Sequence, residues 1–336
     1  MPNPVRITID IGESYVDPYN FVECVALAEK CGINYAWLGD HFLPWTHSRK
    51  RSGFVWSYLP VALDRTKEIK VGPSVTIPIG GRYHPAIIAQ AAATIDNMYP
   101  GRFLLGVGSG EAMSESRFMS NGKWPPWRER IDRLVEGITL MRKLWESEEY
   151  FSFSGKYFSM KDVFLYTKPK SKIEIYFSAL GPKGAAYAGQ YADHLVTIAS
   201  PQKCREEIFP AFEAAAVKAG KDPNKMEKVA NISSWFADSK QSGVEEVRRL
   251  GDAGLFDRGS LDEIDPRKIE QRGTRVSDEQ ILQSKVFVTS PEVLIEEIEQ
   301  YQKVGATSVT IVTQSKPENI RFVGEKVLPY FREDSH

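Results

Sequence analysis

Eight short runs of apolar or β-branched residues alternate with segments of helical periodicity along almost the whole chain. Near-continuous apolar runs are typical of strands in a parallel sheet that is covered on both faces. Between these runs, residues 21–30, 86–98 and 128–145 carry apolar side chains at helical spacing, and Pro85 stands where a first helical turn favours proline. The predicted strands are Arg6–Asp10, Tyr35–Gly39, Lys70–Thr76, Phe103–Gly108, Ile175–Ala179, His194–Ala199, Val229–Ala237 and Ser308–Thr313.

Eight β-then-α units in 336 residues favour a closed (β/α)8 barrel over an open sheet. We therefore predict one α/β domain, a TIM barrel over residues 1–336 with insertions in its βα loops. Residues 150–172 are predicted to form a hairpin before the fifth strand. Residues 243–285 form a longer, charged insertion between the seventh and eighth strands. Long loops at this rim commonly cover a substrate, so we expect a lid, with a plain mobile loop as the alternative.

The composition argues against several classes of partner. Lys plus Arg is 43 and Asp plus Glu is 44, which gives no electrostatic case for nucleic acid or an acidic membrane surface. No stretch approaches the ~18–20 apolar residues of a membrane span, and the N-terminal sequence lacks the pattern of a signal peptide. An odd, low count of 3 cysteines and no metal-binding cluster lead us to expect a cytoplasmic protein without a metal site.

Active sites of (β/α)8 barrels lie at the C-terminal ends of the strands, and this rule selects three residues here. Asp40 and His41 follow the second predicted strand, and Glu111 follows the fourth. A histidine serves as a general base near neutral pH, although a histidine bonded to backbone is the alternative. Glu111 is expected across the barrel mouth from His41; otherwise it is an ordinary acid at a helix N-terminus. Trp45 shares the loop of Asp40 and His41, which favours it over other aromatics as a pocket wall.

Two glycine-bearing turns follow the fourth and fifth predicted strands. Gly106, Gly108 and Gly110 are spaced G-x-G-x-G, which does not match the dinucleotide fingerprint G-x-G-x-x-G. These glycines would let a flat ring or a phosphate approach the backbone, or they simply form a tight turn. Residues 178–184 lead into a helix whose free amides, with Lys183, would bind an anion. The alternative there is a capped helix with a solvated lysine.

Several segments together resemble the luciferase-like barrel superfamily, specifically its coenzyme F420-dependent branch. The resemblance covers nearly the whole chain, loosely over residues 235–285, and is strongest to glucose-6-phosphate dehydrogenases and secondary alcohol dehydrogenases. It implies an oxidoreductase that transfers a hydride between a hydroxyl substrate and C5 of 8-hydroxy-5-deazaflavin. The segments are DHFLPW (40–45), RYHPAIIAQ (82–90), YPGRF (99–103), GVGSGEA (106–112), LWES (144–147), FLYTKP (164–169) and GPKGA (181–185).

The resemblance assigns roles to individual residues. His41 is implied as the base that takes the hydroxyl proton, and Trp45 as the aromatic group that steadies the reacting centre. Glu111 is implied to lie beside the pyrimidine edge of the coenzyme. The peptide bond between Ser74 and Val75 is expected to be cis. The residues implied to hold the coenzyme are Asp40, Ser74, Val75, Ile77, Ser109, Gly110, Ser114, Leu180, Gly181, Lys183 and Gly184.

The substrate divides the two dehydrogenase groups. Sugar-phosphate members carry a threonine and a lysine just after the sixth strand, whereas residues 197–201 here read TIASP, without the lysine. We therefore favour a secondary alcohol, with Ile198 beside it. Lys285 falls near an arginine of the sugar-phosphate members, and Arg258 offers further charge, so a sugar 6-phosphate is the alternative.

Two other functions remain open from the sequence. Luciferase-like barrels also host reduced FMN in monooxygenases, and a non-catalytic coenzyme carrier would bind without turnover. The resemblance also implies a homodimer, and the apolar helix predicted after Pro85 suits a partner as well as the barrel wall.

Overall fold

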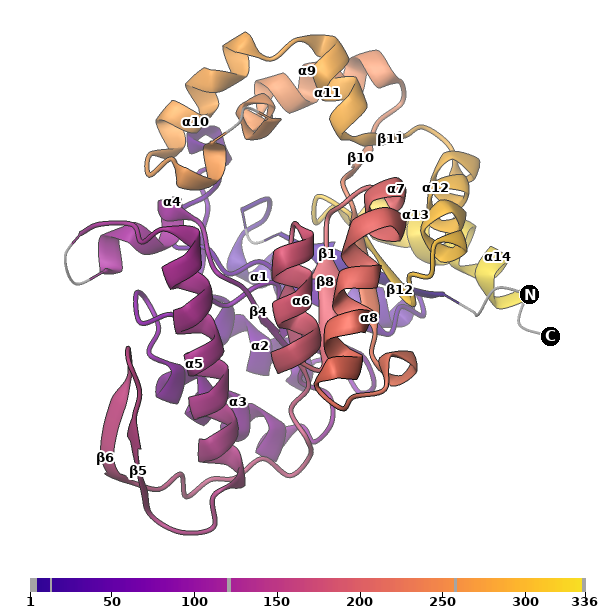
Figure 1. The fold of residues 1–336 in the computed structure, drawn as a ribbon. Helices are drawn as coiled ribbons and strands as arrows, with labels where there is room; N and C mark the ends of the chain where they lie inside the picture. The colour runs from indigo at the N-terminus through magenta and orange to yellow at the C-terminus, as the bar shows by residue number, and fades with distance from the viewer. Residues whose placement is uncertain (1–4, 13, 120–121, 257–258, 334–336) are drawn as a thin grey trace.

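The computed structural model describes residues 5–12, 14–119, 122–256 and 259–333 and forms a barrel of parallel strands surrounded by helices (Figure 1). The strand order is β3-β2-β1-β12-β9-β8-β7-β4, and bridges from Val71 to Phe103 and from Thr76 to Val107 join its two edges. The predicted (β/α)8 architecture is confirmed. The barrel strands are β1 (Arg6–Ile11), β2 (Tyr35–Leu38), β3 (Lys70–Pro73), β4 (Leu105–Val107), β7 (Ile175–Ser178), β8 (His194–Thr197), β9 (Lys228–Ile232) and β12 (Ser308–Val312).

Helices surround the strands, and their ends follow local capping chemistry. The Asp17 carboxylate accepts hydrogen bonds from two amides in the first turn of α1, and Gly32 follows that helix at φ +80°. Pro85 opens α3 as predicted, directly after His84. The helices around the barrel are α1 (Pro18–Lys30), α2 (Val55–Asp64), α3 (Pro85–Met98), α5 (Trp127–Glu146), α6 (Pro182–Tyr191), α8 (Phe209–Lys218), α12 (Pro291–Lys303), α13 (Pro317–Phe322) and α14 (Leu328–Glu333).

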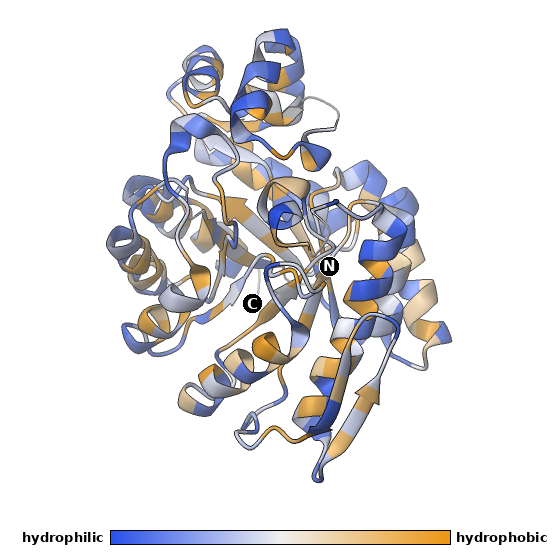
Figure 2. Cartoon of the chain, turned by 90° about the vertical axis from the view of Figure 1, so that its left-hand side faces the viewer, coloured by the Kyte–Doolittle hydropathy of each residue, from blue (hydrophilic) through white to orange (hydrophobic). Residues whose placement is uncertain are grey.

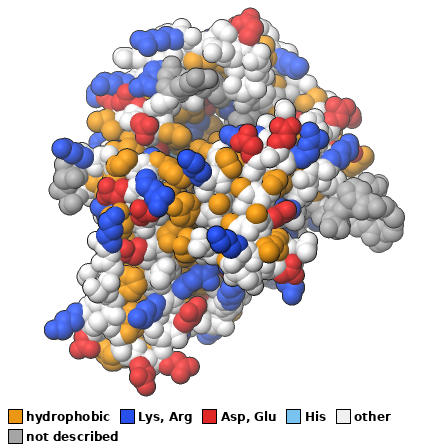
Figure 3. All heavy atoms as spheres, in the orientation of Figure 1, with side chains coloured by type: hydrophobic (Ala, Val, Ile, Leu, Met, Phe, Trp, Pro, Cys, Tyr) orange, Lys and Arg blue, Asp and Glu red, His pale blue; other side chains and the backbone are white. Residues whose placement is uncertain are grey.

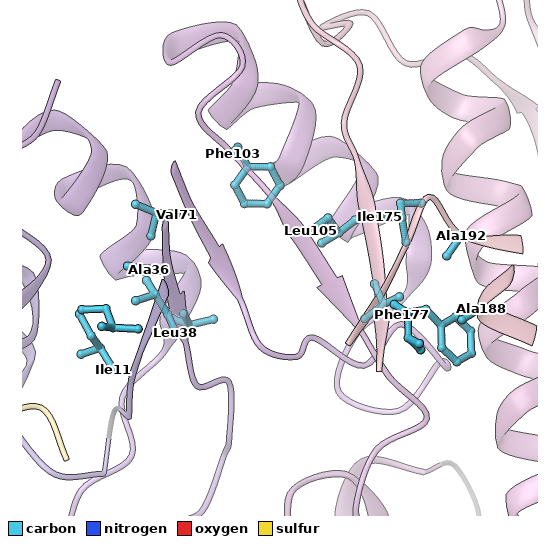
Figure 4. Packing of buried hydrophobic residues seen from close by; sticks show 14 of the residues in the cluster. Ile11, Ala36, Leu38, Val71, Phe103, Leu105, Ile175, Phe177, Ala188 and Ala192 are labelled. Atoms are coloured by element: carbon cyan, nitrogen blue, oxygen red, sulfur yellow. The ribbon is translucent and has the colours of Figure 1, made fainter. Parts of the chain in front are cut away.

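Two hydrophobic layers stabilise the barrel. Outward-facing strand residues such as Leu38, Val71 and Phe177 are fully buried in the layer beneath the helices (Figure 4). Figure 2 shows that apolar residues gather on the strands and on the helix sides that face them. A second cluster, which includes the buried Trp37 and Tyr176, comes from alternate positions on the strands and fills the interior of the barrel. Because the interior is filled, a binding site has room only at an end of the barrel.

The seventh predicted strand, Val229–Ala237, is wrong as a single element. β9 ends at Ile232, and a separate strand β10 (Ser234–Phe236) pairs in parallel with β11 (Val286–Val288) outside the barrel. The reason is that β12, the barrel neighbour of β9, itself ends at Val312, where the Ser234 hydroxyl donates to the Val312 carbonyl. Beyond that point the chain has no barrel strand to pair with.

The segment 243–285 is largely helical, whereas its charge and glycines suggested a loop. It lies above the barrel in Figure 1 and has a core of its own, which includes Trp235, Val247 and Ile281. Ser239 and Ser277 each form a capping box that starts a helix, a local signal that the charge pattern obscured. The elements of this insertion are α9 (Lys240–Arg249), the 3-10 helix η5 (Asp252–Phe256), α10 (Pro266–Arg272) and α11 (Asp278–Ser284).

The segment before β7 contains the predicted hairpin, formed by β5 (Phe151–Ser154) and β6 (Ser159–Val163).

On the face shown in Figure 3, lysine and arginine side chains are interspersed with acidic ones. Across the described ranges, the search for a helix of sufficient length and apolarity to cross a bilayer finds none. Among the same residues, no group of three or more His, Cys, Asp or Glu is placed to hold a metal ion.

Candidate active site

Asp40 lies at the centre of a buried hydrogen-bond network just beyond β2. Its Oδ1 accepts from Arg82 Nη2 at 2.8 Å and from the Tyr83 hydroxyl at 2.8 Å, while its Oδ2 accepts from the Thr76 hydroxyl at 2.6 Å. Burial raises the pKa of the Asp40 carboxyl, and Arg82 opposes that shift. The network joins the loop after β2 to the segment after β3. Asp40 therefore fixes the backbone next to His41.

His41, Trp45 and Glu111 come together at the C-terminal end of the barrel. His41 Nε2 lies 3.8 Å from Glu111 Oε1, and both side chains are mostly buried, at 16% and 11% exposed. The His41 and Trp45 rings meet edge to face, with centroids 5.2 Å apart. The Ser52 hydroxyl donates to the His41 carbonyl at 2.6 Å and so fixes the backbone of the histidine. The expectation that Glu111 lies across the mouth from His41 agrees with this geometry.

Arg82 and Glu115 complete the network, and sequence reasoning assigned neither of them a role. Arg82 Nε lies 3.3 Å from Glu115 Oε1, and the Glu115 side chain is fully buried. Burial raises the pKa of Glu115 to about 8; Arg82 opposes this shift, and the nearby Glu111 and Asp40 add to it. The sequence did offer one signal for Glu115. It lies four residues after Glu111, and this spacing places both side chains on one face of a helical turn.

The substitution Glu115→Gln tests this carboxyl through the pH dependence of stability. The folded pKa of about 8 lies above the ordinary 4.5, so between these values the folded state holds a proton that the unfolded state has lost. Stability of the natural protein therefore falls as pH rises through this window. The glutamine variant lacks that loss, and its unfolding free energy relative to the natural protein should rise by up to about 1.4 kcal/mol per pH unit. Urea unfolding at several pH values from 5 to 8 measures it; a constant difference would contradict the assignment.

The segment after β3 packs against the glycines after β4. The peptide bond between Ser74 and Val75 is cis, as the resemblance implied. A Cβ on Gly108 would lie 2.7 Å from Val75 Cγ2, and one on Gly110 would lie 2.8 Å from Ile77 Cγ2. Gly110 also has φ +80°, which side chains rarely adopt. The predicted coenzyme residues on these two loops are therefore in contact, and the loops tolerate no larger residue at either glycine.

Arg130 and Ser114 hold the loop after β4 in place. Arg130 Nη1 donates to the Gly110 carbonyl at 2.7 Å and to the Ser109 carbonyl at 3.3 Å, while its guanidinium lies over the Trp124 ring. The Ser114 hydroxyl accepts from the Phe42 amide at 3.2 Å, which connects this loop to the one that carries His41. These backbone carbonyls and side chains give the loop a single, well-supported conformation.

The β7–α6 turn lies beside the β4 loop, because β4 and β7 are neighbours in the sheet. Gly181 precedes the first turn of α6, and a Cβ there would meet no atom within 4 Å. Lys183 and Leu180 are exposed, Gly184 is buried, and the Leu180 carbonyl accepts from Lys203 Nζ at 3.2 Å. The residues of this turn, which were predicted to bind an anion, thus lie at an exposed helix start with the free amides that an anion requires.

The three predicted substrate residues are not all brought together. Ile198 follows β8 at the barrel mouth and is 63% exposed. Lys285 lies in the insertion, 3.5 Å from the Ser233 hydroxyl and over the Trp235 ring, and burial lowers its pKa to about 8. Arg258 lies outside the described residues. The roles given to these residues therefore stay predictions.

Known proteins share both the sequence and the shape of this chain. The model of the luciferase-like monooxygenase family matches residues 4–308. F420-dependent glucose-6-phosphate dehydrogenase 2 of Rhodococcus jostii is 33% identical over 290 residues, which are 86% of each chain. A structure of an F420-dependent secondary alcohol dehydrogenase in complex with an F420-acetone adduct has a TM-score of 0.90 and 35% identity, covering 97% of this chain and 98% of that one.

A more distant neighbour extends the likeness of fold. The coenzyme F420-dependent tetrahydromethanopterin reductase of Methanopyrus kandleri has a TM-score of 0.75 at 21% identity, covering 98% of this chain and 99% of that one. At this identity the likeness concerns the fold alone. The family match spans most of the chain, and the R. jostii enzyme is related over most of its length. The chain belongs to the luciferase-like monooxygenase family.

Proposed function

We propose that this protein is a coenzyme F420-dependent oxidoreductase that acts on the CH–OH group of a small substrate. The observation that carries the proposal is the His41–Glu111 pair, 3.8 Å apart at the barrel mouth beside Trp45. A base and an acid at this spacing suit the removal of a hydroxyl proton on one side and the support of a polar ring on the other. The names of the R. jostii relative and of the alcohol dehydrogenase neighbour support the same reaction class.

The residues at the mouth fit a deazaflavin with a phosphate-bearing tail. Among the described residues, the buried Glu111 Oε1 and Trp124 Nε1 have no hydrogen-bond partner. A bound ring with polar edges would relieve such unpartnered atoms. When bound, the coenzyme supplies a carbon centre that accepts or returns a hydride. The residues proposed to hold it are Asp40, Ser74, Val75, Ile77, Ser109, Gly110, Ser114, Leu180, Gly181, Lys183 and Gly184.

Each catalytic side chain has one task in this proposal. His41 Nε2 accepts the proton of the substrate hydroxyl, which raises electron density on the carbon that loses the hydride. Trp45 contacts the imidazole edge to face and limits its rotation. Glu111 would lie beside the pyrimidine edge of the bound coenzyme and would balance the charge that changes there. Asp40, besides its proposed place at the coenzyme, is held by Arg82, Tyr83 and Thr76 and supports the backbone that it shares with His41.

We favour a secondary alcohol as substrate, with a sugar 6-phosphate as the second candidate. Ile198 presents an apolar, 63% exposed side chain on the loop after β8, which suits an alkyl substituent. Lys285 supports the phosphate alternative, because it places a cation beside the Ser233 hydroxyl and over the Trp235 ring. A reduced-FMN monooxygenase and a coenzyme carrier without turnover are the competing functions.

Anaerobic titration with oxidised F420 tests the proposal. The purified protein is mixed with the coenzyme, isopropanol or glucose 6-phosphate is added, and the visible absorbance of the coenzyme is followed. We expect bleaching with isopropanol. Faster bleaching with glucose 6-phosphate would select the sugar-phosphate reading. Binding of F420 without bleaching by either substrate would favour the carrier, and preferential binding of FMN would favour the monooxygenase.

We also propose a cytoplasmic homodimer. Ile87 and Met98 are exposed at 59% and 52%, and their spacing of eleven residues places them on one face of α3. Two large apolar side chains on one exposed helix face suit a second copy of the chain. Light scattering at micromolar concentration should give twice the monomer mass of 37.9 kDa.

A further inference from the structure

The loop that carries His41 and Trp45 is bonded to the insertion at three successive points. The Thr46 hydroxyl donates to the Leu250 carbonyl at 2.9 Å. The Ser48 amide and hydroxyl both donate to the Glu270 carboxylate, at 2.9 and 2.7 Å. These contacts begin at the residue directly after Trp45. The insertion is therefore bonded to the continuation of the catalytic loop, and the barrel strands are not its only support.

The third point is an ion pair between Arg49 and Asp252. Arg49 Nε and Nη2 donate to the two carboxylate oxygens of Asp252 at 2.9 and 2.6 Å, and the side chains are only 7% and 0% exposed. Arg49 also donates to the hydroxyls of Ser14 and Tyr15, and its guanidinium lies over the Tyr15 ring. One side chain thus joins the loops after β1 and β2 to the insertion.

Stability alone does not explain such a pair. Removing two charges from water is costly, and well-packed apolar residues commonly replace buried ion pairs without loss of stability. A two-pronged guanidinium–carboxylate contact instead fixes distance and angle together, which a lysine or an apolar contact does not do. The contact is placed four residues after Trp45, where a fixed geometry determines how the rest of the loop lies.

We propose that Arg49 and Asp252 are positioning residues through which the insertion sets the conformation of the loop carrying His41 and Trp45. The inference rests on the proposed function for its catalytic consequence, and on the contacts above for its structural one. It assigns the η5 and α10 part of the insertion a scaffolding task, because this part is bonded to the loop that carries His41 and Trp45.

The substitution Arg49→Lys keeps the positive charge and removes the two-pronged contact of the guanidinium with the Asp252 carboxylate. We expect kcat to fall by about tenfold or more, since a misplacement of about 1 Å near reacting groups costs up to about 10²-fold. The dissociation constant of F420 should stay within about twofold, because the contacts of Arg49 described above are to Ser14, Tyr15 and Asp252, none of which is a proposed coenzyme residue. Hydrogen exchange should become severalfold faster at the amides of Ser48, which is bonded to Glu270, and of Arg49 and Lys50, which are bonded within this loop.

A matched control is Arg248→Lys, which alters an arginine–aspartate pair that lies wholly inside the insertion, between Arg248 and Asp278. It should change neither kcat nor exchange in the catalytic loop. Should Arg49→Lys fail to fold, Thr46→Val removes one of the other bonds with little change of volume and should move both readouts in the same direction.

The two readouts separate failure of this inference from failure of the proposed function. If the natural protein turns over and Arg49→Lys matches it in kcat and in loop exchange, the positioning role is wrong. A loss of kcat with unchanged loop exchange would also overturn it, because the effect would then not act through the loop. If the natural protein shows no turnover, the proposed function fails, and the exchange measurement alone still decides whether Asp252 holds the loop.

Discussion

His41→Ala should lower kcat by about 10²–10⁴-fold, the range expected when a general base is removed from proton transfer. The imidazole lies 3.8 Å from Glu111 and meets Trp45 edge to face, so it is held ready for a substrate hydroxyl. Alanine leaves the Asp40 network intact, because that network involves the neighbouring carboxylate and not the imidazole. Affinity for F420 should therefore change little while turnover collapses. Stopped-flow bleaching of the coenzyme measures the step directly.

His47→Ala is the matched control for this experiment. His47 belongs to the same loop, but its side chain is exposed. Its removal should leave kcat within about twofold, which is the behaviour of surface substitutions. A His41→Ala enzyme that keeps more than about a tenth of natural turnover would exclude His41 as the base, and the search would move to the other polar groups at the mouth.

Asp40→Ala should destabilise the protein by about 3–5 kcal/mol, because it breaks a buried ion pair with Arg82. Three donors lose a carboxylate acceptor at once, namely Arg82 Nη2, the Tyr83 hydroxyl and the Thr76 hydroxyl, and of these Arg82 Nη2 keeps its bond to the backbone carbonyl of residue 40. The Asp40 side chain is 0% exposed and that of Arg82 is 8% exposed, so water does not readily replace the lost oxygens. The unfolding free energy from urea denaturation, compared at one pH, gives the value.

Asp132→Ala provides the comparison of an exposed aspartate. Asp132 pairs with Arg128 on the surface of α5, where the two side chains are 32% and 71% exposed. Exposed pairs contribute about 0–1 kcal/mol, so this variant should remain near the natural protein. Equal losses in the two variants would mean that the Asp40 network adds nothing beyond an ordinary surface pair.

The barrel could be predicted from the sequence because its signals are local. Each strand is a short apolar run, and helices carry their own period and start signals, as Pro85 in the first turn shows for α3. The proximity of His41 and Glu111 could also be predicted, because both lie just beyond strand ends and the strand ends of a parallel barrel converge. The roles given to the coenzyme and substrate residues remain predictions.

Other features could not be predicted because they depend on contacts between distant segments. Nothing local to Arg82 shows that its guanidinium lies between Asp40 and Glu115, which are separated from it by more than thirty residues in each direction. The end of β9 at Ile232 depends on where β12 ends, about eighty residues later. The helices inside the insertion were not predicted for a different reason, because charges and glycines obscured the capping serines that start two of them.

The parallel pair β10–β11 places the two ends of the insertion side by side. A segment that leaves and rejoins a scaffold at adjacent strands can be exchanged or resized without shifting the register of the eight barrel strands. The substrate range of such a barrel can therefore diversify by grafting, with the hydride-transfer machinery left untouched. The buried Asp252 limits such exchange. A replacement segment has to supply an acidic partner for Arg49, because otherwise the loop that carries His41 and Trp45 would be poorly ordered.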